Sequence, residues 1–350
     1  MRAVVIEGFG GALGVRDVPD PQAPDGGVVV RVAATGLCRS DWHAYAGHDP
    51  DVVLPHVPGH EFAGTVAAVG AGVPPELGVR VGDRVTAPFV HACGACEPCR
   101  RGEQQVCADQ RQPGFTGWGS FAELVVVERA AVNLLRLPDA VDVAAAAVLG
   151  CRFATSFRAL TRIGRLAPGE WLAVHGCGGV GLSAVMIAVA AGARVVAVDV
   201  SPAALRLAAG LGAAATVDAT GLSWDATAAA VRDAAGGGVH VSVAALGCEA
   251  TCAASIASLR PRGRHVQIGL LPPAAAPPAV PMHLVIAGEL EVLGSHGMAA
   301  HAYPELLGLV AAGRLDPTRL VTGTIGLDAA PAALAAMGDA PPAGVLLVTP

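Results

Sequence analysis

Residues 1–150 carry short apolar runs that glycine, proline and aspartate separate. Runs of this length between such residues are typical of β-strands. Five of them are Met1–Ile6, Val28–Val32, Gly64–Val69, Arg84–Ala87 and Leu124–Val127. The pattern therefore predicts that this part of the chain is mostly β-structure.

From about Ala154 the pattern changes to buried-strand runs that alternate with helical segments. Strands are expected at Trp171–His175, Arg194–Asp199, Val239–Ala244 and Arg264–Ile268, with helices such as Leu182–Ala191 between them. Alternating strands and helices favour a parallel, doubly wound sheet. The chain is thus expected to be an α/β protein with a β-rich part and a dinucleotide-fold part.

Length and composition agree with a two-domain globular chain. The 350 residues are 53% hydrophobic and 15% charged, with a formal net charge of −6. That length corresponds to about two domains, and the acidic balance gives no general attraction to nucleic acid or acidic membranes. The first residues read as a strand and not as a signal peptide, so we expect a cytoplasmic location. Cysteines stay reduced there, which favours metal binding over disulfides.

Four cysteines lie within one short segment, with the spacing C-x2-C-x2-C-x7-C, at Cys93, Cys96, Cys99 and Cys107. Four thiolates this close in sequence can surround one tetrahedral Zn²⁺ ion. A redox or disulfide cluster is the alternative, and the expected reducing compartment disfavours it. The spacing therefore predicts a closed, structural zinc site.

A glycine-rich turn follows the strand Trp171–His175. Its residues are Gly176, Cys177, Gly178, Gly179, Val180 and Gly181, which fit G-x-G-x-x-G, and Asp199 ends the next strand. Such glycines let the backbone approach a pyrophosphate at a helix N-terminus, and the acidic residue binds the adenosine ribose. The Asp199 carboxylate would repel a 2′-phosphate, so the pattern predicts NAD(H) over NADP(H). A turn that serves only helix–strand packing is the alternative.

Cys38, His60 and Cys151 are potential ligands of a second metal ion. A Cys/His/Cys set leaves one tetrahedral position open, as a catalytic zinc requires. The residues are far apart in sequence, and a lone buried cysteine or histidine is more often structural. The sequence pattern by itself leaves both interpretations open.

Five motifs in order resemble the zinc-dependent medium-chain dehydrogenase/reductase superfamily, of the alcohol dehydrogenase type. They are C-R-S-D-W-H at 38–43, G-H-E at 59–61, the cysteine run, G-C-R-F-A-T at 150–155, and the glycine turn with Asp199. The resemblance implies a GroES-like catalytic domain at residues 1–152, to which the carboxyl-terminal segment 296–350 also belongs. It implies a Rossmann domain at 153–295, inserted between these segments.

The resemblance also implies site residues. Cys38, His60 and Cys151 would bind a catalytic zinc, with Glu61 behind the metal and Asp41 orienting His60. Ser40 and His43 would relay the proton while an alcohol and an aldehyde or ketone are interconverted by hydride transfer with NAD(H). Further cofactor contacts are expected from Arg39, Thr155, Val180, Ile268 and Leu270. Substrate-pocket residues are expected at Phe89, Phe115, Trp118, Leu270 and Ser295.

Some features depart from the family pattern or leave alternatives open. Ala343-Gly344-Val345 stands where many relatives carry a pyrophosphate-binding arginine, and Ala204 replaces a frequent lysine. A polyol, sugar-alcohol or specialised secondary-metabolite alcohol dehydrogenase is the main alternative. A zinc-free quinone or enoyl reductase and a non-enzymatic zinc-module protein are further ones. By resemblance, we expect a homotetramer or a dimer, a small-molecule substrate, and no nucleic-acid or membrane partner.

Overall fold

The structure is a computed structural model that describes residues 1–271, 278–339 and 341–350. Its residues form two compact units, one from Met1–Ala154 with Gly297–Pro350 and the other from Thr155–His296. None of the helices in these described ranges combines the length and the apolarity needed to cross a membrane.

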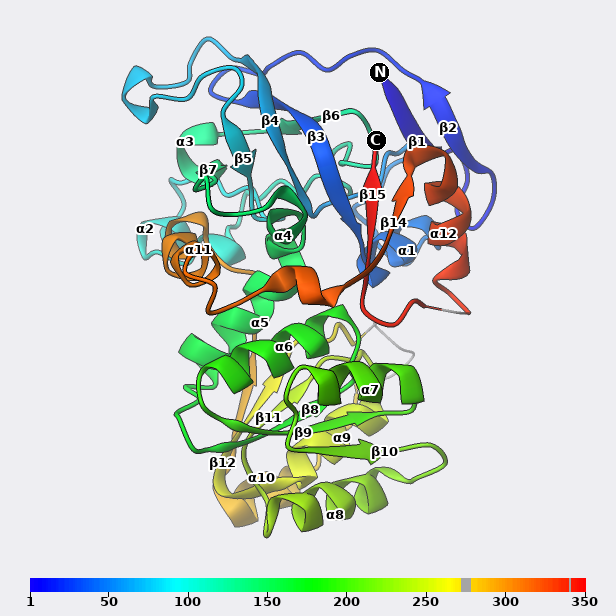
Figure 1. Ribbon diagram of the computed structural model, residues 1–350, viewed down its shortest axis with the longest axis vertical. Helices are drawn as coiled ribbons and strands as arrows, with labels where there is room; N and C mark the ends of the chain where they lie inside the picture. Colours follow the sequence, from blue (N-terminus) through cyan, green and yellow to red (C-terminus); the bar gives the residue numbers. More distant parts are fainter. Residues whose placement is uncertain (272–277, 340) are drawn as a thin grey trace. The chain divides into compact units, whose positions relative to one another are not determined.

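The first unit is built around one mixed sheet (Figure 1). The strands run in the order β14-β15-β3-β4-β5-β7, and β6 also pairs with β3. Their bounds are β3 Val28–Leu37, β4 Phe62–Val69, β5 Arg84–Thr86, β6 Leu124–Val127, β7 Leu135–Arg136, β14 Val321–Gly326 and β15 Val345–Thr349. A separate hairpin joins β1 Arg2–Ile6 to β2 Leu13–Asp17. The carboxyl-terminal strands β14 and β15 therefore complete the sheet that β3 to β7 form.

Short helices fill the loops of the first unit. They are α1 Arg39–Tyr45, α2 Glu97–Arg100, α3 Ala130–Asn133, α4 Val143–Ala147, α11 Tyr303–Ala311 and α12 Ala330–Ala336. A π-helical turn, Leu149–Phe153, follows α4, and α5 Ala154–Arg158 comes next. The sheet's core contains Val28, Val30, Phe62, Val85 and Val125, all nearly inaccessible to solvent. All of them except Phe62 come from the apolar runs that predicted the strands, because β4 begins two residues before the predicted start at Gly64.

The second unit is the predicted doubly wound sheet, with strand order β10-β9-β8-β11-β12-β13 and all pairs parallel. The strands are β8 Trp171–His175, β9 Arg194–Asp199, β10 Ala215–Asp218, β11 Val239–Ala244, β12 Leu259–Gln267 and β13 Glu291–Gly294. The helices are α6 Gly179–Ala190, α7 Pro202–Gly210, α8 Trp224–Ala235, α9 Glu249–Ala257 and α10 Met282–Gly288.

The chain reverses direction across this sheet between β8 and β11. Right-handed crossovers therefore put α6 and α7 on one face and α8 and α9 on the other, as Figure 1 shows. Ligands of such sheets bind beyond the carboxyl ends of the strands, at the point of reversal. The glycine turn after β8 lies at this point.

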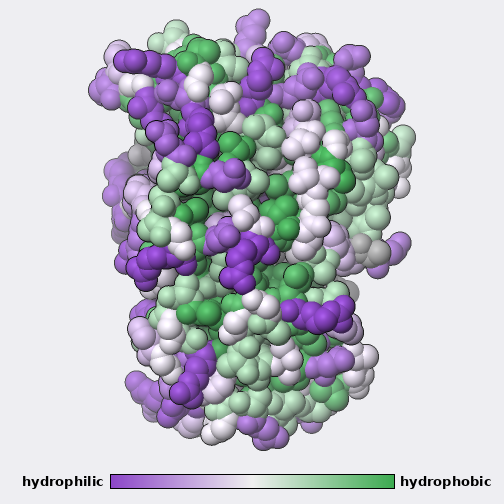
Figure 2. Space-filling view, viewed as in Figure 1, coloured by the Kyte–Doolittle hydropathy of each residue, from purple (hydrophilic) through white to green (hydrophobic). Residues whose placement is uncertain are grey.

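The surface of the second unit is weakly polar over its helices. Figure 2 shows mostly pale-green and white residues where α6, α7 and α8 face the viewer, with scattered hydrophilic ones. Alanine accounts for this, as in the α8 sequence WDATAAAVRDAA. Alanine is the strongest helix former, so these helices form without a wide charged face.

The strand β12 begins five residues before the expected start at Arg264. Its first half contains exposed Arg260, Pro261 and Arg262, and the pairing with β11 shifts register there. A half-exposed, irregular strand end lacks the apolar run on which the prediction depended.

Candidate functional site

Cys38 lies where β3 passes into α1. It is the N-cap residue of α1, and its backbone amide donates to Asp41 Oδ2 at 2.9 Å. This reciprocal contact with the third helical residue is the capping-box arrangement. The cap fixes the position of the thiol, which is buried together with the Asp41 carboxylate.

Asp41 also fixes His60. Its Oδ1 accepts from His60 Nδ1 at 2.8 Å and from the Gly59 amide at 3.0 Å. Because a carboxylate can only accept here, Nδ1 carries the hydrogen and Nε2 presents its lone pair. His60 Nε2 is buried and has no hydrogen-bond partner among the described residues. Burial lowers the pKa of His60, whereas Asp41 and Cys38 together raise it well above its usual value, so the surroundings favour a positive charge at this ring. A cation bound at Nε2 would take the place of the second ring proton.

Cys151 comes to the same place from the π-helical turn Leu149–Phe153. The ligand atoms of Cys38, His60 and Cys151 all lie within 4.8 Å of one another. The hydrogen bond between the two thiols lowers the pKa of Cys38 and raises that of Cys151. The donor set is thus two sulfurs and one imidazole nitrogen that lie close together. Zn²⁺ prefers ligands of these kinds.

A buried ion pair supports this cluster. Arg152 Nε donates to Glu61 Oε2 at 2.7 Å, the Arg152 amide donates to Oε1 at 2.6 Å, and Arg152 Nη1 donates to the Leu37 carbonyl at 2.9 Å. Glu61 is thus held by both ends of its carboxylate, between His60 and the chain segment of Cys151. The sequence analysis missed Arg152. Its signal was a lone arginine inside the apolar run Leu149–Ala154.

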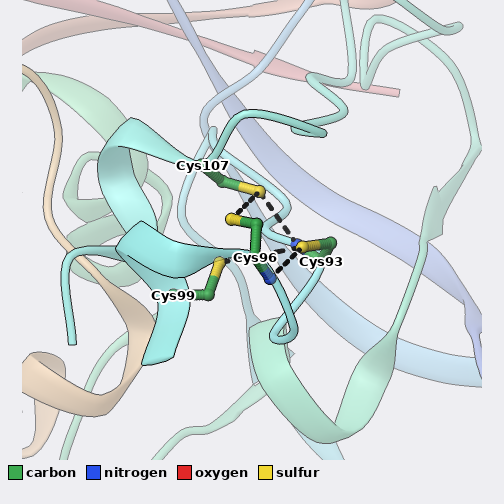
Figure 3. A group of neighbouring side chains, drawn as sticks. All are labelled: Cys93, Cys96, Cys99 and Cys107. Atoms are coloured by element: carbon green, nitrogen blue, oxygen red, sulfur yellow. Dashed lines mark hydrogen bonds between the residues drawn. The ribbon is translucent and has the colours of Figure 1, made fainter. Parts of the chain in front are cut away.

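The four cysteines of the run form the second cluster, shown in Figure 3. Their sulfurs approach pairwise, with Cys93 Sγ and Cys99 Sγ 3.9 Å apart and Cys96 Sγ and Cys107 Sγ 3.7 Å apart. All are free thiols. Backbone amides of Cys99 and Ala108 lower the pKa of Cys96 to about 6, whereas burial raises that of Cys99 to about 12. Separate thiols whose sulfurs converge are what a tetrahedral Cys₄ zinc site requires.

Asn133, the last residue of α3, ties this helix to the cysteine segment. Its Oδ1 accepts from the Ala92 amide at 2.8 Å, and its Nδ2 donates to the Ala92 carbonyl at 3.1 Å. Ala92 immediately precedes Cys93, so this buried amide fixes where the cluster begins. No sequence pattern singled out Asn133.

The predicted relay residues share the helix α1. Ser40 Oγ lies 3.8 Å from Cys38 Sγ, and His43 lies one turn later, half-buried. Arg39 stacks on Trp42, with its guanidinium 4.6 Å from the ring, and Arg39 Nη1 donates to the Met337 carbonyl at 2.7 Å. The expected pyrophosphate contact of Arg39 therefore stays a prediction, with one of its nitrogens engaged elsewhere.

The glycine turn and Asp199 are joined in the second unit. Asp199 Oδ2 accepts from the Cys177 amide at 2.6 Å and Oδ1 from the Ser201 amide at 2.8 Å. Gly176 has φ +92°, a conformation that glycine adopts without strain. Any side chain at Gly181 would collide with the Gly176 carbonyl, so this glycine allows α6 to pack against the turn. The backbone amides at the start of α6 can receive an anion.

The remaining expected cofactor residues lie in the second unit. Thr155 is buried, and the Ser156 hydroxyl next to it donates to the Val180 carbonyl at 2.8 Å. Ile268 follows β12, where its amide donates to the Ala244 carbonyl at 3.0 Å. Leu270 is exposed (65%). Ile268 and Leu270 therefore follow the carboxyl end of β12, and Ile268 also contacts the end of β11.

The expected substrate residues do not all lie together. Phe115 and Phe89 pack beside His60, with ring centroids 5.1 and 6.1 Å away. Trp118 is 41% exposed and lines a surface groove of about 260 Å³ with Met1, Asp20 and Leu124. Ser295 is buried in the second unit, and its hydroxyl has no hydrogen-bond partner among the described residues. The two phenylalanines thus wall the Cys38–His60–Cys151 cluster with apolar surface.

The chain matches two protein families along most of its length. The alcohol dehydrogenase GroES-like domain matches residues 24–139, and the zinc-binding dehydrogenase family matches residues 179–312. An alcohol dehydrogenase of Geobacillus stearothermophilus is 36% identical over 84% of both chains.

Solved structures show the same likeness over the whole chain. Alcohol dehydrogenase TADH from Thermus sp. ATN1 is 33% identical, with a TM-score of 0.89 over 100% of this chain and 99% of that one. A Sinorhizobium meliloti 1021 protein solved with NADP bound is 30% identical, with a TM-score of 0.86 over 100% and 99%. These matches confirm the predicted fold class, a GroES-like part with a Rossmann part. The chain belongs to the zinc-dependent alcohol dehydrogenases of the medium-chain dehydrogenase/reductase superfamily.

Proposed function

We propose that this oxidoreductase uses NAD(H) and holds two Zn²⁺ ions per subunit, a catalytic one at Cys38, His60 and Cys151 and a structural one at Cys93, Cys96, Cys99 and Cys107. The observation that carries the proposal is the buried Nε2 of His60, which faces two thiols and has no hydrogen-bond partner in the part of the chain that the structure describes. Burying an imidazole nitrogen without a hydrogen-bond donor costs free energy unless a ligand binds to that nitrogen.

Bound in these places, Zn²⁺ supplies Lewis-acid polarisation of the alcohol or carbonyl oxygen, and the nicotinamide supplies the hydride acceptor or donor. The chain's own residues prepare the reaction. Asp41 holds the His60 tautomer, Ser40 takes the proton of the alcohol, and His43 carries it onward. Phe89 and Phe115 keep bulk water from the reacting oxygen.

The structural site has no position for a substrate, because four thiolates complete a tetrahedral shell. Its role is to hold its segment in shape. Both sites need reduced thiols, which favours the expected cytoplasmic location.

NAD(H) is proposed over NADP(H) on the ground of Asp199. Its carboxylate is held by two backbone amides at the end of β9, where the adenosine ribose of a dinucleotide binds in folds of this kind. An anion in that position disfavours a 2′-phosphate. The missing carboxyl-terminal arginine, at Ala343-Gly344-Val345, leaves the pyrophosphate to the amides of the glycine turn.

The apolar wall favours simple alcohols over the polyol alternative. A polyol brings several hydroxyls that must be hydrogen-bonded when they are buried. The Phe89 and Phe115 rings beside His60 offer no such partners.

The decisive experiment combines zinc quantification with an assay of primary alcohols, secondary alcohols, polyols and aldehydes, each with NAD(H) and NADP(H). We expect two zinc ions per chain, activity on apolar alcohols and a preference for NADH. One zinc per chain would revive the zinc-free reductase alternative. A tenfold preference for NADPH would overturn the cofactor assignment, and polyol turnover with no simple-alcohol turnover would overturn the substrate class.

A homo-oligomer that uses the edge of the second sheet is part of the proposal. The strand β13 is an edge strand, and α10 has no buried residue. Met282 (52%), Ile286 (75%) and Val292 (43%) expose apolar side chains there. Exposed edges and apolar patches of this kind mark association sites. Light scattering should show a dimer or tetramer, and Val292→Arg with Ile286→Glu should reduce its size. A wild-type monomer would contradict this part.

A further inference from the structure

The carboxyl end of α1 brings a second histidine beside His43. After the helix ends at Tyr45, Gly47 adopts φ +76°, and its amide donates to the Ala44 carbonyl at 3.2 Å. The His48 amide then donates to the His43 carbonyl at 2.9 Å. These two bonds around a left-handed glycine form a Schellman motif, in which the residue after the glycine returns to the last helical turn. The local sequence thus places residue 48 against residue 43.

The two imidazole rings meet edge to edge through their Nδ1 atoms. His43 Nδ1 and His48 Nδ1 are 3.0 Å apart, and the ring centroids are 5.3 Å apart. Trp42 packs its ring against both, with centroids 5.0 Å from His43 and 5.4 Å from His48. The backbone turn and the indole therefore hold this pair of side chains together.

A contact between two Nδ1 atoms at this distance needs one hydrogen between them. A neutral imidazole has one N–H, so one ring donates from Nδ1 and the other accepts. The rings differ in exposure, because His43 is half-buried and His48 is exposed. Water therefore reaches His48 more readily than His43.

The charges around the pair favour moving a proton outward. Burial lowers the pKa of His43, and His48 and Arg39 lower it further, while Cys38 and Asp49 oppose them. The Asp49 carboxylate accepts from the Asp51 amide at 3.0 Å and lies beside His48 in sequence. A proton on His43 is therefore poorly held, and the neighbouring exposed ring is its nearest acceptor.

We propose that His43 and His48 act as one proton-carrying pair and that His48 exchanges the proton with water. This rests on the proposed function, in which His43 carries the proton from Ser40. A proton arriving at His43 gives a singly charged pair that shares one hydrogen between its Nδ1 atoms. His48 then releases one proton to water. One proton enters and one leaves, and no electrons move.

Kinetics of four variants test the pair. His48→Gln keeps a hydrogen-bonding group but cannot carry a proton, so kcat should fall about 10-fold, and free imidazole in the buffer should restore it. The kcat of His43→Gln should fall further, by about 100-fold. Gly47→Ala should lower kcat as much as His48→Gln, although both imidazole rings are present. Gly47 has a positive φ, and a Cβ there would lie 3.0 Å from Phe9, so the turn that holds His48 against His43 should be disturbed. His301→Gln, an exposed histidine elsewhere, is the control, and zinc content should be unchanged throughout.

Nitrogen-15 NMR of labelled histidines gives a readout that does not depend on turnover. The wild-type rings should titrate in two linked steps, and His43 should titrate in a single step in His48→Gln. Unchanged His43 titration and unchanged kcat in His48→Gln would overturn the pair. If His43→Gln still lost activity in that case, the relay of the proposed function would stand. If His43→Gln also kept wild-type kcat, the relay itself would fail.

Discussion

At the scale of single residues, the proposed chemistry depends on which potential ligand atoms have no hydrogen-bond partner among the described residues. Asp41 accepts a hydrogen bond from His60 Nδ1, which leaves Nε2 facing the thiols of Cys38 and Cys151. The motifs predicted these residues, and the resemblance implied that Asp41 orients His60. Only the folded chain shows which atoms meet, Asp41 Oδ1 and His60 Nδ1, and therefore which ring nitrogen carries the hydrogen.

Ser40→Ala tests the inner end of the relay. The hydroxyl is the only proton carrier that the substitution removes, and Ser40 is not a proposed metal ligand. We expect kcat to fall about 100-fold or more while zinc content stays at the wild-type level. Steady-state kinetics with metal analysis of the same sample measure both. Wild-type kcat in this variant would exclude Ser40 from the proton path.

A pair of cysteine variants distinguishes the two metal sites. Cys38→Ser removes a ligand of the open site, so activity and one zinc should be lost while the melting temperature changes little. Cys96→Ser should cost several kcal/mol of stability, because structural zinc sites contribute folding energy. Turnover per folded molecule should then stay near wild type. Thermal unfolding and active-site titration of both variants measure these effects. Loss of stability in Cys38→Ser and loss of turnover in Cys96→Ser would mean that the catalytic and structural sites had been assigned the wrong way round.

At the scale of elements, the strands and helices followed the apolar pattern closely. The predicted strands at 124–127, 171–175, 194–199 and 239–244 have the observed bounds of β6, β8, β9 and β11. The early start of β12 and the π-helical turn that carries Cys151 were not predictable. Both depend on contacts with other segments, because exposed arginines and a local change of helical pitch give no periodic signal.

Gly36 and Gly308 form a matched test of what a glycine does inside an element. A Cβ at Gly36 in β3 would lie 2.7 Å from Glu61 Oε2 and would also collide with Arg152, whereas a Cβ at Gly308 in α11 would meet nothing within 4 Å. Gly36→Ala should therefore destabilise by about 1–3 kcal/mol, through overpacking against the buried ion pair. Gly308→Ala should stabilise by about 0.5–1 kcal/mol, as in other exposed helix interiors.

Denaturant unfolding of both variants at one pH measures these differences. An unchanged stability of Gly36→Ala would show that the ion pair can move aside. It would weaken the view that Glu61 is rigidly held.

At the scale of the whole molecule, two units supply different parts of the proposed reaction. All residues of both metal clusters belong to the unit of Met1–Ala154 and Gly297–Pro350. The glycine turn and Asp199 belong to the unit of Thr155–His296. The family resemblance implied this division, because spacing alone could not bring Cys38, His60 and Cys151 together. Neither spacing nor resemblance indicated the buried support that Arg152 gives to Glu61 and that Asn133 gives to the cysteine segment.

Buried histidines of the second unit make the stability of the protein dependent on pH. His265 Nδ1 contacts Ser255 Oγ at 3.0 Å, and His175 Nε2 contacts Ser258 Oγ at 3.5 Å. Burial lowers the pKa of His175 to about 3 and that of His265 to about 4, from an ordinary value of 6.5. Between the ordinary and the lowered values, the unfolded chain binds protons that the folded chain does not. The free energy of unfolding therefore falls as the pH falls below 6.5.

Each such histidine should contribute a slope of about 1.4 kcal/mol per pH unit in that window. Denaturant unfolding from about pH 7 to about pH 5 measures the slope, and His265→Gln should make it shallower by about one proton. The comparison uses the slope and not the absolute stability, so a general loss of packing in the variant does not confuse it. His283→Gln, at an exposed position of α10, should keep the wild-type slope. Equal slopes in all three proteins would mean that His265 is protonated in the folded state, and its contact with Ser255 would then have to rearrange below neutral pH.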